Sequence, residues 1–171
     1  MNKKLRILAV AMTVTVIAAA CFLINRGVFS KHLTVKNRDT HELYASYDLK
    51  EGDCFSITFI HSVNKTPVTD YFFIENGHIV NEACKYYGFG AGVQTQLNEG
   101  EQLEYTDDGG MLITNIHANR DNVGYIVGTV SDHILRLNAD PHEAPSGNED
   151  AVDISLRDMC GRSTAIRFNY E

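Results

Sequence analysis

The chain alternates between apolar and polar residues most clearly in FSITFIH at residues 55–61 and in VTDYFFI at residues 68–74. Successive side chains of a strand point to opposite faces of a sheet, so this alternation predicts two strands with one apolar face each. Asn76-Gly77 follows directly and is typical of tight hairpins, because both residues tolerate positive φ. Residues 54–84 therefore predict three consecutive antiparallel strands.

The apolar faces of the first two strands match in one antiparallel register. It places Ile57 opposite Ile74 and Phe59 opposite Phe72. A slip of one residue would turn the apolar side chains of one strand away from those of the other. The same register places His61 opposite Asp70, at the open end of the apolar face.

Short runs rich in Ile, Val, Thr, Phe and Tyr recur after residue 31, separated by turn sequences such as DDGG at 107–110. The polar residues 93–104 predict a loop. The fold class is therefore all-β, with about eight to ten short strands closed as a two-sheet sandwich or a small open barrel. The expected strands are 32–38, 42–49, 54–62, 68–76, 78–84, 111–118, 123–130, 133–138, 151–157 and 164–170.

The first 31 residues differ from the rest. Basic residues up to Arg6 precede an uncharged apolar span at 7–24, which would be about 27 Å long as a helix. It predicts a transmembrane signal anchor and short linker in residues 1–31, a single-pass location in the cell membrane, and an extracytoplasmic β-domain at 32–171. Cleavage near Ala18-Ala19-Ala20 and lipid attachment at Cys21 are the alternatives, and both also place the domain outside the cytoplasm.

The domain is strongly acidic. From residue 32 on, 10 basic and 22 acidic residues give a net charge of −12. Such a domain repels phosphate backbones, so we expect no nucleic acid partner. Outside the apolar span the cysteines are Cys54, Cys84 and Cys160. Their odd number leaves their pairing open, and their spacing indicates neither a metal site nor a cofactor.

Polar residues are concentrated in HSVNKTPVTD at 61–70, and a glycine-rich run, YYGFGAG, follows at 86–92. A histidine beside a carboxylate at the rim of a sheet is an arrangement that holds a neutral imidazole toward a ligand or a metal; the alternative is a hydrogen-bonded cap of the core. The glycines allow close approach of the backbone. We expect no catalytic nucleophile, because His61 and Ser62 are neighbours on a strand and point to opposite faces, which keeps them from forming a nucleophile–base pair. The expected site-forming residues are His61, Ser62, Thr66, Asp70, Gly88, Gly90 and Gly92.

Two motifs taken together resemble a bacterial family known as domain of unknown function 1850. They are His61-Ser62-Val63 with Lys65-Thr66-Pro67-Val68 and Asp70-x-Phe72, and then Tyr87-Gly88-Phe89-Gly90-Ala91-Gly92. The resemblance spans about residues 33–140. Two departures are a shorter carboxylate at Asp70, where the family tends to carry Glu, and a segment after residue 140 that matches no pattern of the family.

The resemblance implies an extracytoplasmic accessory module of a tripartite ATP-independent periplasmic transporter, in the subgroup with TAXI-type solute receptors. The implied partners are the transporter permease or its solute receptor, and a small organic anion as ligand. A membrane-anchored binding module is thus the expected function. The alternatives are a small hydrolase or lyase that uses His61 and Asp70 as an acid–base pair, and a structural interaction domain.

Overall fold

The computed structural model describes residues 12–17, 31–88, 94, 96–142 and 151–171. The chain divides into two compact units, residues 1–31 and 32–171. In the first unit residues 12–17 are helical, and the remainder of the expected span 7–24 lies outside the described residues. Within the described residues, no helix has both the length and the apolarity needed to cross a membrane.

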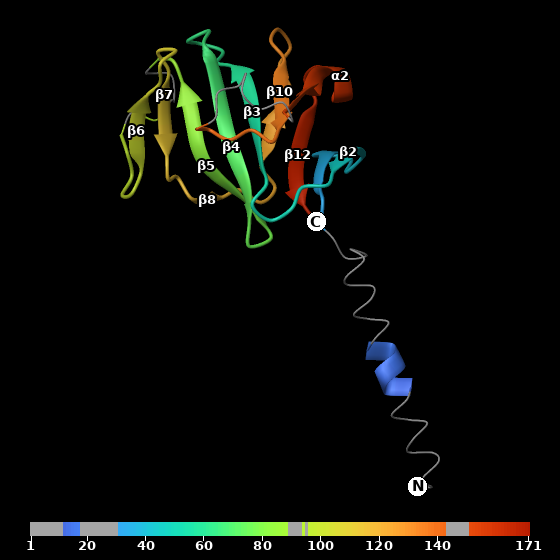
Figure 1. The fold of residues 1–171 in the computed structure, drawn as a ribbon. Helices are drawn as coiled ribbons and strands as arrows, with labels where there is room; N and C mark the ends of the chain where they lie inside the picture. Colours follow the sequence, from blue (N-terminus) through green and yellow to red (C-terminus); the bar gives the residue numbers. More distant parts are fainter. Residues whose placement is uncertain (1–11, 18–30, 89–93, 95, 143–150) are drawn as a thin grey trace, which may run out of the picture. The chain divides into compact units, whose positions relative to one another are not determined.

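The second unit consists of two antiparallel sheets, which confirms the all-β class (Figure 1). The four-stranded sheet has the order β2 (Leu43–Tyr47), β1 (Leu33–Asn37), β12 (Ala165–Tyr170) and β9 (Gly124–Ile126). The eight-stranded sheet has the order β11 (Val152–Ser155), β10 (His133–Leu137), β3 (Cys54–Ile60), β4 (Pro67–Glu75), β5 (His78–Tyr86), β7 (Met111–Thr114) and β6 (Gln102–Tyr105), with β8 (Ala118–Asn119) paired to β5. A short helix, α2 (Leu156–Cys160), connects β11 to β12.

The described residues contain twelve strands, more than the eight to ten expected. The prediction of a loop over residues 93–104 is wrong at its end, because β6 begins at Gln102. This strand is polar, but each of its four residues pairs with a residue of the buried strand β7. Pairing with a buried neighbour thus makes a strand where the composition of the segment does not predict one.

Large apolar side chains of both sheets meet in the space between them. Phe55 of β3 stacks on Phe72 of β4, with 5.0 Å between the ring centroids, and on Phe168 of β12 at 5.9 Å. Leu33 and Val35 of β1 are fully buried in the same cluster. Each such side chain contributes about 1.5–3 kcal/mol on burial, and together they hold the sheets face to face in a sandwich-like arrangement.

The strands β3 and β4 pair in a different register from the expected one. Ile57 lies opposite Asp70 instead of Ile74, a shift of four residues. The expected pairing of His61 with Asp70 in this ladder is therefore wrong. The predicted faces are correct, because a shift by an even number of residues leaves each side chain on the same face.

The end of the ladder explains the shift. The pairing continues to Ile60 opposite Pro67, and the backbone N–H of His61 donates to the carbonyl of Thr66 at 2.9 Å. A register chosen only by matching apolar side chains takes no account of these additional backbone hydrogen bonds. Lys65 closes the turn with a φ of 57°.

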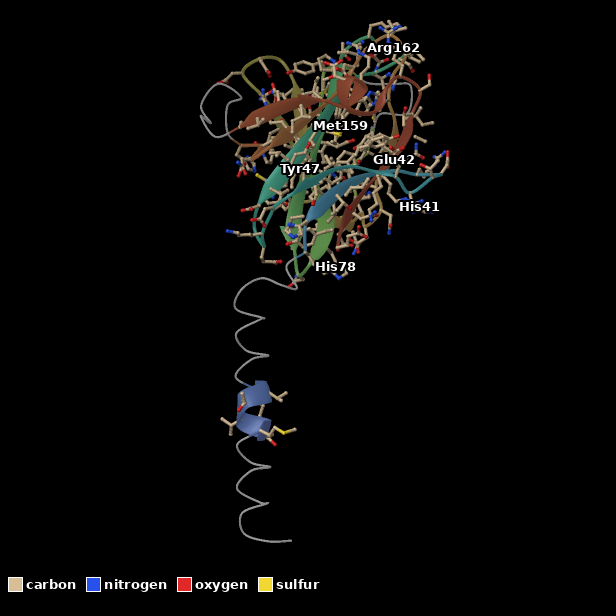
Figure 2. The ribbon with its side chains drawn as sticks, turned by 90° about the vertical axis from the view of Figure 1, so that its right-hand side faces the viewer. His41, Glu42, Tyr47, His78, Met159 and Arg162 are labelled. Atoms are coloured by element: carbon tan, nitrogen blue, oxygen red, sulfur yellow. The ribbon has the colours of Figure 1, made fainter. Side chains whose placement is uncertain are left out.

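The two ends of the sandwich carry different turns. The Asn76-Gly77 hairpin forms as predicted between β4 and β5, with φ values of 52° and 73°. Figure 2 shows His78, just after this hairpin, and Arg162 at opposite ends of the 32–171 unit. The turn at residues 61–66 lies at the other end of β4 from the hairpin, and the candidate site lies beside it.

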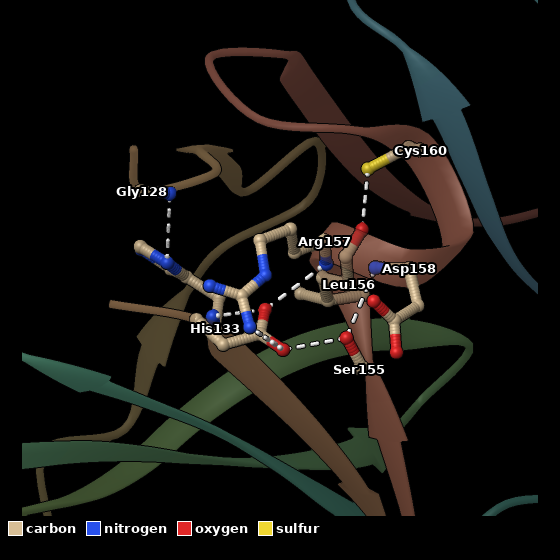
Figure 3. A network of polar contacts seen from close by, with 8 residues as sticks. Gly128, His133, Ser155, Leu156, Arg157, Asp158 and Cys160 are labelled. Carbon is tan, nitrogen blue, oxygen red and sulfur yellow. Dashed lines mark hydrogen bonds and ion pairs between the residues drawn. The ribbon is translucent and has the colours of Figure 1, made fainter. Parts of the chain in front are cut away.

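A polar network fixes the start of β10 against helix α2 (Figure 3). The carboxylate of Asp132 accepts hydrogen bonds from the backbone N–H of His133 at 2.7 Å and of Arg157 at 3.0 Å, and from the hydroxyl of Ser155 at 2.5 Å. The ring Nδ1 of His133 accepts from the backbone N–H of Gly128 at 3.2 Å. The His133 ring is thereby held on the inner face of the sheet, next to the site.

Candidate functional site

One carboxylate interrupts an otherwise apolar row across the inner face of the eight-stranded sheet. Asp70 of β4 pairs with Ile57 of β3 on one side and with Cys84 of β5 on the other. The row continues through apolar residues on the flanking strands. Its members are Ile154, Leu135, Ile57, Asp70, Cys84, Ile113 and Leu103.

Asp70 opens onto a cavity of about 310 Å³ at this part of the sheet. That volume lies at the small end of the range for ligand sites, roughly 300–1,000 Å³. The walls are mostly apolar and aromatic. The described lining residues are Phe59, His61, Val68, Asp70, Cys84, Tyr86, Gln94 and Ile113.

Two side chains donate hydrogen bonds to the Asp70 carboxylate. The hydroxyl of Tyr125 donates to Oδ2 at 2.7 Å, and the thiol of Cys84 is the second donor. Burial raises the pKa of Asp70, and these two donors and the charge of Arg120 lower it by less. Burial and the neighbouring carboxylate raise the pKa of the Cys84 thiol, so the thiol stays protonated and able to donate.

Tyr125 connects the two sheets at this point. It belongs to β9 of the four-stranded sheet, and its ring packs against Phe59 at 6.1 Å and edge-on against Phe168 at 6.3 Å. Burial and the charge of Asp70 raise the pKa of its hydroxyl well above the usual value. Tyr125 therefore acts as a hydrogen-bond donor at all physiological pH values.

His61 faces the cavity from the turn at residues 61–66. Its ring Nδ1 accepts hydrogen bonds from the backbone N–H groups of Val63 at 3.3 Å and Asn64 at 3.2 Å. An accepting Nδ1 carries no proton, so the neutral ring has its proton on Nε2. Within the described residues no hydrogen bond joins His61 to Asp70, although both line the same cavity.

The other residues of the expected site lie around this turn. Ser62 is exposed and Thr66 is half-buried, and neither is among the lining residues. The carbonyl of Gly88 accepts a hydrogen bond from the side-chain amide of Asn64 at 3.3 Å, which joins the glycine-rich run to the turn. Gly90 and Gly92 lie outside the described residues.

Sequence reasoning did not find four residues that build the site. Tyr125 and Cys84 hold the carboxylate, and Gln94 accepts a hydrogen bond from the Tyr86 hydroxyl through its backbone carbonyl at 3.1 Å. His133 stacks on Phe59 with 5.3 Å between the rings, and burial lowers its pKa. The strand alternation of residues 78–86 places Cys84 on the inner face; no local pattern points to Tyr125 or His133 as neighbours of Asp70.

A second cavity of about 310 Å³ lies on the outer face of the same sheet. The one basic group among its described lining residues is paired, because Arg136 binds the carboxylate of Asp153 through Nε and one terminal nitrogen, each at 2.6 Å. The carboxylate of Asp140, which also lines this cavity, accepts a hydrogen bond from the backbone N–H of His142 at 2.8 Å. The hydroxyls of Thr58 and Thr69 bond to each other at 2.9 Å. The inner cavity, with a carboxylate in an apolar setting, is the stronger candidate.

The cysteines and histidines form no further centre in the described residues. Cys84 and Cys160 form no disulfide with a described residue. No group of three or more His, Cys, Asp or Glu side chains in the described part of the chain has metal-binding geometry.

Fold and site together define a small antiparallel two-sheet β-domain with a polar group at the floor of an inner cavity. A family model described as "Domain of unknown function (DUF1850)" matches residues 55–143, about half of the chain. The chain belongs to this family, which confirms the resemblance. The match covers β3, β4, β5 and the 61–66 turn. No curated protein and no solved structure matches the chain.

Proposed function

We propose that the chain is a membrane-anchored extracytoplasmic binding module that takes a small organic molecule into the cavity at Asp70. The observation that carries the proposal is the Asp70 carboxylate, set in an apolar row and facing a cavity of ligand size. Ligand sites commonly combine apolar walls with a few polar groups that fix orientation. Asp70 and His61 are the polar groups that would do so here.

The anchor in this proposal is a transmembrane helix over residues 7–24. The span contains no charged residue and follows Lys3, Lys4 and Arg6, a pattern that favours a cytoplasmic N-terminus. The acidic domain at residues 32–171 would then lie outside the cytoplasm. A tether of this kind raises the concentration of the domain near a membrane partner to about the millimolar range.

The family resemblance supplies the partner in this proposal. It is the permease or the TAXI-type solute receptor of a tripartite ATP-independent periplasmic transporter. The experiment is affinity purification of the full chain from detergent-solubilised membranes of its own host, with a variant lacking residues 7–24 as the control. We expect such a permease or receptor to co-purify with the full chain and much less with the variant. Recovery of neither component would overturn the docking part and leave the ligand part standing.

The ligand part is tested on the purified full chain by ligand-observed NMR with a library of small organic molecules. We expect binders that are lost in Asp70→Asn and retained in Asp107→Asn, which makes the same chemical change at an exposed turn. Binders that respond to neither variant would place the site elsewhere.

One alternative has an observation in its favour. His61 and Asp70 line the same cavity, which is what a small hydrolase or lyase with an acid–base pair needs. In that case a bound molecule would be converted, and its NMR signals would be replaced by those of a product over time. Unchanged signals of every binder support the binding module.

A further inference from the structure

We propose that the cavity selects a small organic cation, an amine with a short apolar body, whose ammonium group pairs with Asp70. This inference rests on the proposed ligand-binding role of the cavity and names the chemical class of its ligand. It runs against the organic anion that the family resemblance implies. Three features of the molecule support it.

The first feature is the charge of the lining. Asp70 is the one acidic side chain among the described lining residues, and none of these residues is Lys or Arg. The ring of His61 accepts two backbone hydrogen bonds at Nδ1, so in this geometry it is neutral. A carboxylate in an apolar site is unfavourable without a partner, and an ammonium group supplies both opposite charge and hydrogen bonds.

The second feature is the chemistry of the walls. Phe59 and Tyr86 contribute aromatic rings, and Val68 and Ile113 contribute aliphatic surface. Cations are attracted to the faces of aromatic rings, by about 0.5–2 kcal/mol depending on desolvation. Aliphatic surface packs against the hydrocarbon part of an amine but offers no hydrogen bond or opposite charge to a second charged group.

The third feature is the field of the whole domain. From residue 32 on the net charge is −12, which raises the local concentration of cations and lowers that of anions. Arg120 acts in the other direction, since its charge lowers the pKa of Asp70. It is exposed and is not a lining residue, so salt screens its effect on a ligand more than it screens the contact with Asp70.

An anion would require a different state of the site. A ligand carboxylate next to Asp70 is stable only if the two carboxyl groups share a proton. Among the described residues, the groups that act on Asp70 are the Tyr125 hydroxyl, the Cys84 thiol, the charge of Arg120 and, across the cavity, His61. Binding of an anion must therefore weaken as the pH rises and Asp70 ionises, whereas binding of an ammonium ion must strengthen.

The test compares three probes of equal length on the purified full chain: n-butylammonium, n-butanol and n-butyrate. Dissociation constants are measured by NMR titration between about pH 5 and pH 8. We expect n-butylammonium to bind about tenfold or more tightly than n-butanol at the upper pH, and n-butyrate to bind most weakly. The affinity for n-butylammonium should rise with pH in the unmodified protein, which is a readout that needs no variant.

Two variants then test whether the preference for n-butylammonium depends on the Asp70 carboxylate. Asp70→Asn should weaken n-butylammonium binding about tenfold or more and remove its advantage over n-butanol, while Asp107→Asn should leave the affinities of all three probes unchanged. Binding of n-butyrate as tight as that of n-butylammonium, with both weakened in Asp70→Asn, would overturn the cation proposal and leave the ligand-binding function standing. No effect of Asp70→Asn on any probe would place the site elsewhere and overturn both proposals. If none of the three probes binds, both proposals fail.

Discussion

The hydrogen bond from Tyr125 to Asp70 joins the two sheets at the floor of the cavity, at 2.7 Å. Replacing Tyr125 by Phe removes one oxygen and keeps the ring contacts with Phe59 and Phe168. The acceptor is a carboxylate, so we expect the free energy of unfolding to fall by about 1.5–3 kcal/mol at neutral pH. For a domain of this size that is a lowering of the Tm by about 3–12 °C.

This loss depends on pH with a definite sign. Burial raises the pKa of Asp70, and the Tyr125 hydroxyl lowers it, so Tyr125→Phe raises this pKa further. The folded variant therefore binds the proton of Asp70 more tightly than the folded wild type does. The destabilisation should be largest above the pKa of Asp70 and should shrink as the pH falls through it.

The assay is urea unfolding of the purified full chain, followed by circular dichroism at about pH 8 and about pH 4. Tyr170→Phe is the matched control, because the hydroxyl of Tyr170 donates to a neutral acceptor, the carbonyl of Leu49, at 3.0 Å. Its expected cost is about 0.5–1.5 kcal/mol at both pH values. A Tyr125→Phe cost no larger than this, or one that is the same at both pH values, would refute the reasoning about the carboxylate.

Three other substitutions test separate parts of the fold by the same unfolding measurement. Asp108→Asn should lower the free energy of unfolding by about 0.5–1 kcal/mol. The hydrogen bond that Lys85 donates to Asp108 at 2.7 Å is the main cause of the low pKa of this carboxyl group. Its contribution to stability is therefore present at neutral pH and lost in strong acid. Gly128→Ala should cost about 2 kcal/mol or more, because a Cβ there would lie 2.3 Å from the backbone oxygen of Ser131; full stability would mean that this turn rearranges freely. Ser155→Ala should cost about 1–2 kcal/mol, because the Ser155 hydroxyl caps helix α2 and binds Asp132; no loss would show that the cap is dispensable.

The predictable part of the fold is the part that depends on burial along a single strand. Alternation alone placed Phe55, Ile57 and Phe59 on one face, and Asp70 on the matching face of the next strand, as the structure has them. The register was wrong because it depends on backbone hydrogen bonds at the 61–66 turn, whose geometry the side-chain pattern does not encode. The correct faces nevertheless bring Asp70 and His61 to one cavity, although not as a pair.

Residues from distant strands could not be predicted in the same way. Tyr125 reaches Asp70 across the space between the sheets, over a separation of 55 residues, and no local pattern in one sequence records such a contact. Helix α2 is different, because the sequence contains a local signal for the start of this helix. Ser155-Leu156-Arg157-Asp158 is a capping sequence at a helix start, and Ser155 does accept from the backbone N–H of Asp158 at 3.0 Å.

The position of Asp70 separates a structural role from a binding role. Every other residue of its row is apolar or a thiol, and apolar replacement of a buried polar group is often neutral or stabilising. Its raised pKa means that its contribution to stability is complete below the pKa of the unfolded state and is lost as the pH rises through the folded pKa. At neutral pH the carboxylate thus opposes folding, so the fold alone does not account for it.

A ligand that neutralises Asp70 would reverse this effect, since a ligand at a hundred times its Kd stabilises the folded state by about 2.7 kcal/mol. Ligand binding at Asp70 and the stability of the domain are therefore linked. A bound cation should raise the Tm most at the pH values at which the ionised, empty site lowers the Tm most.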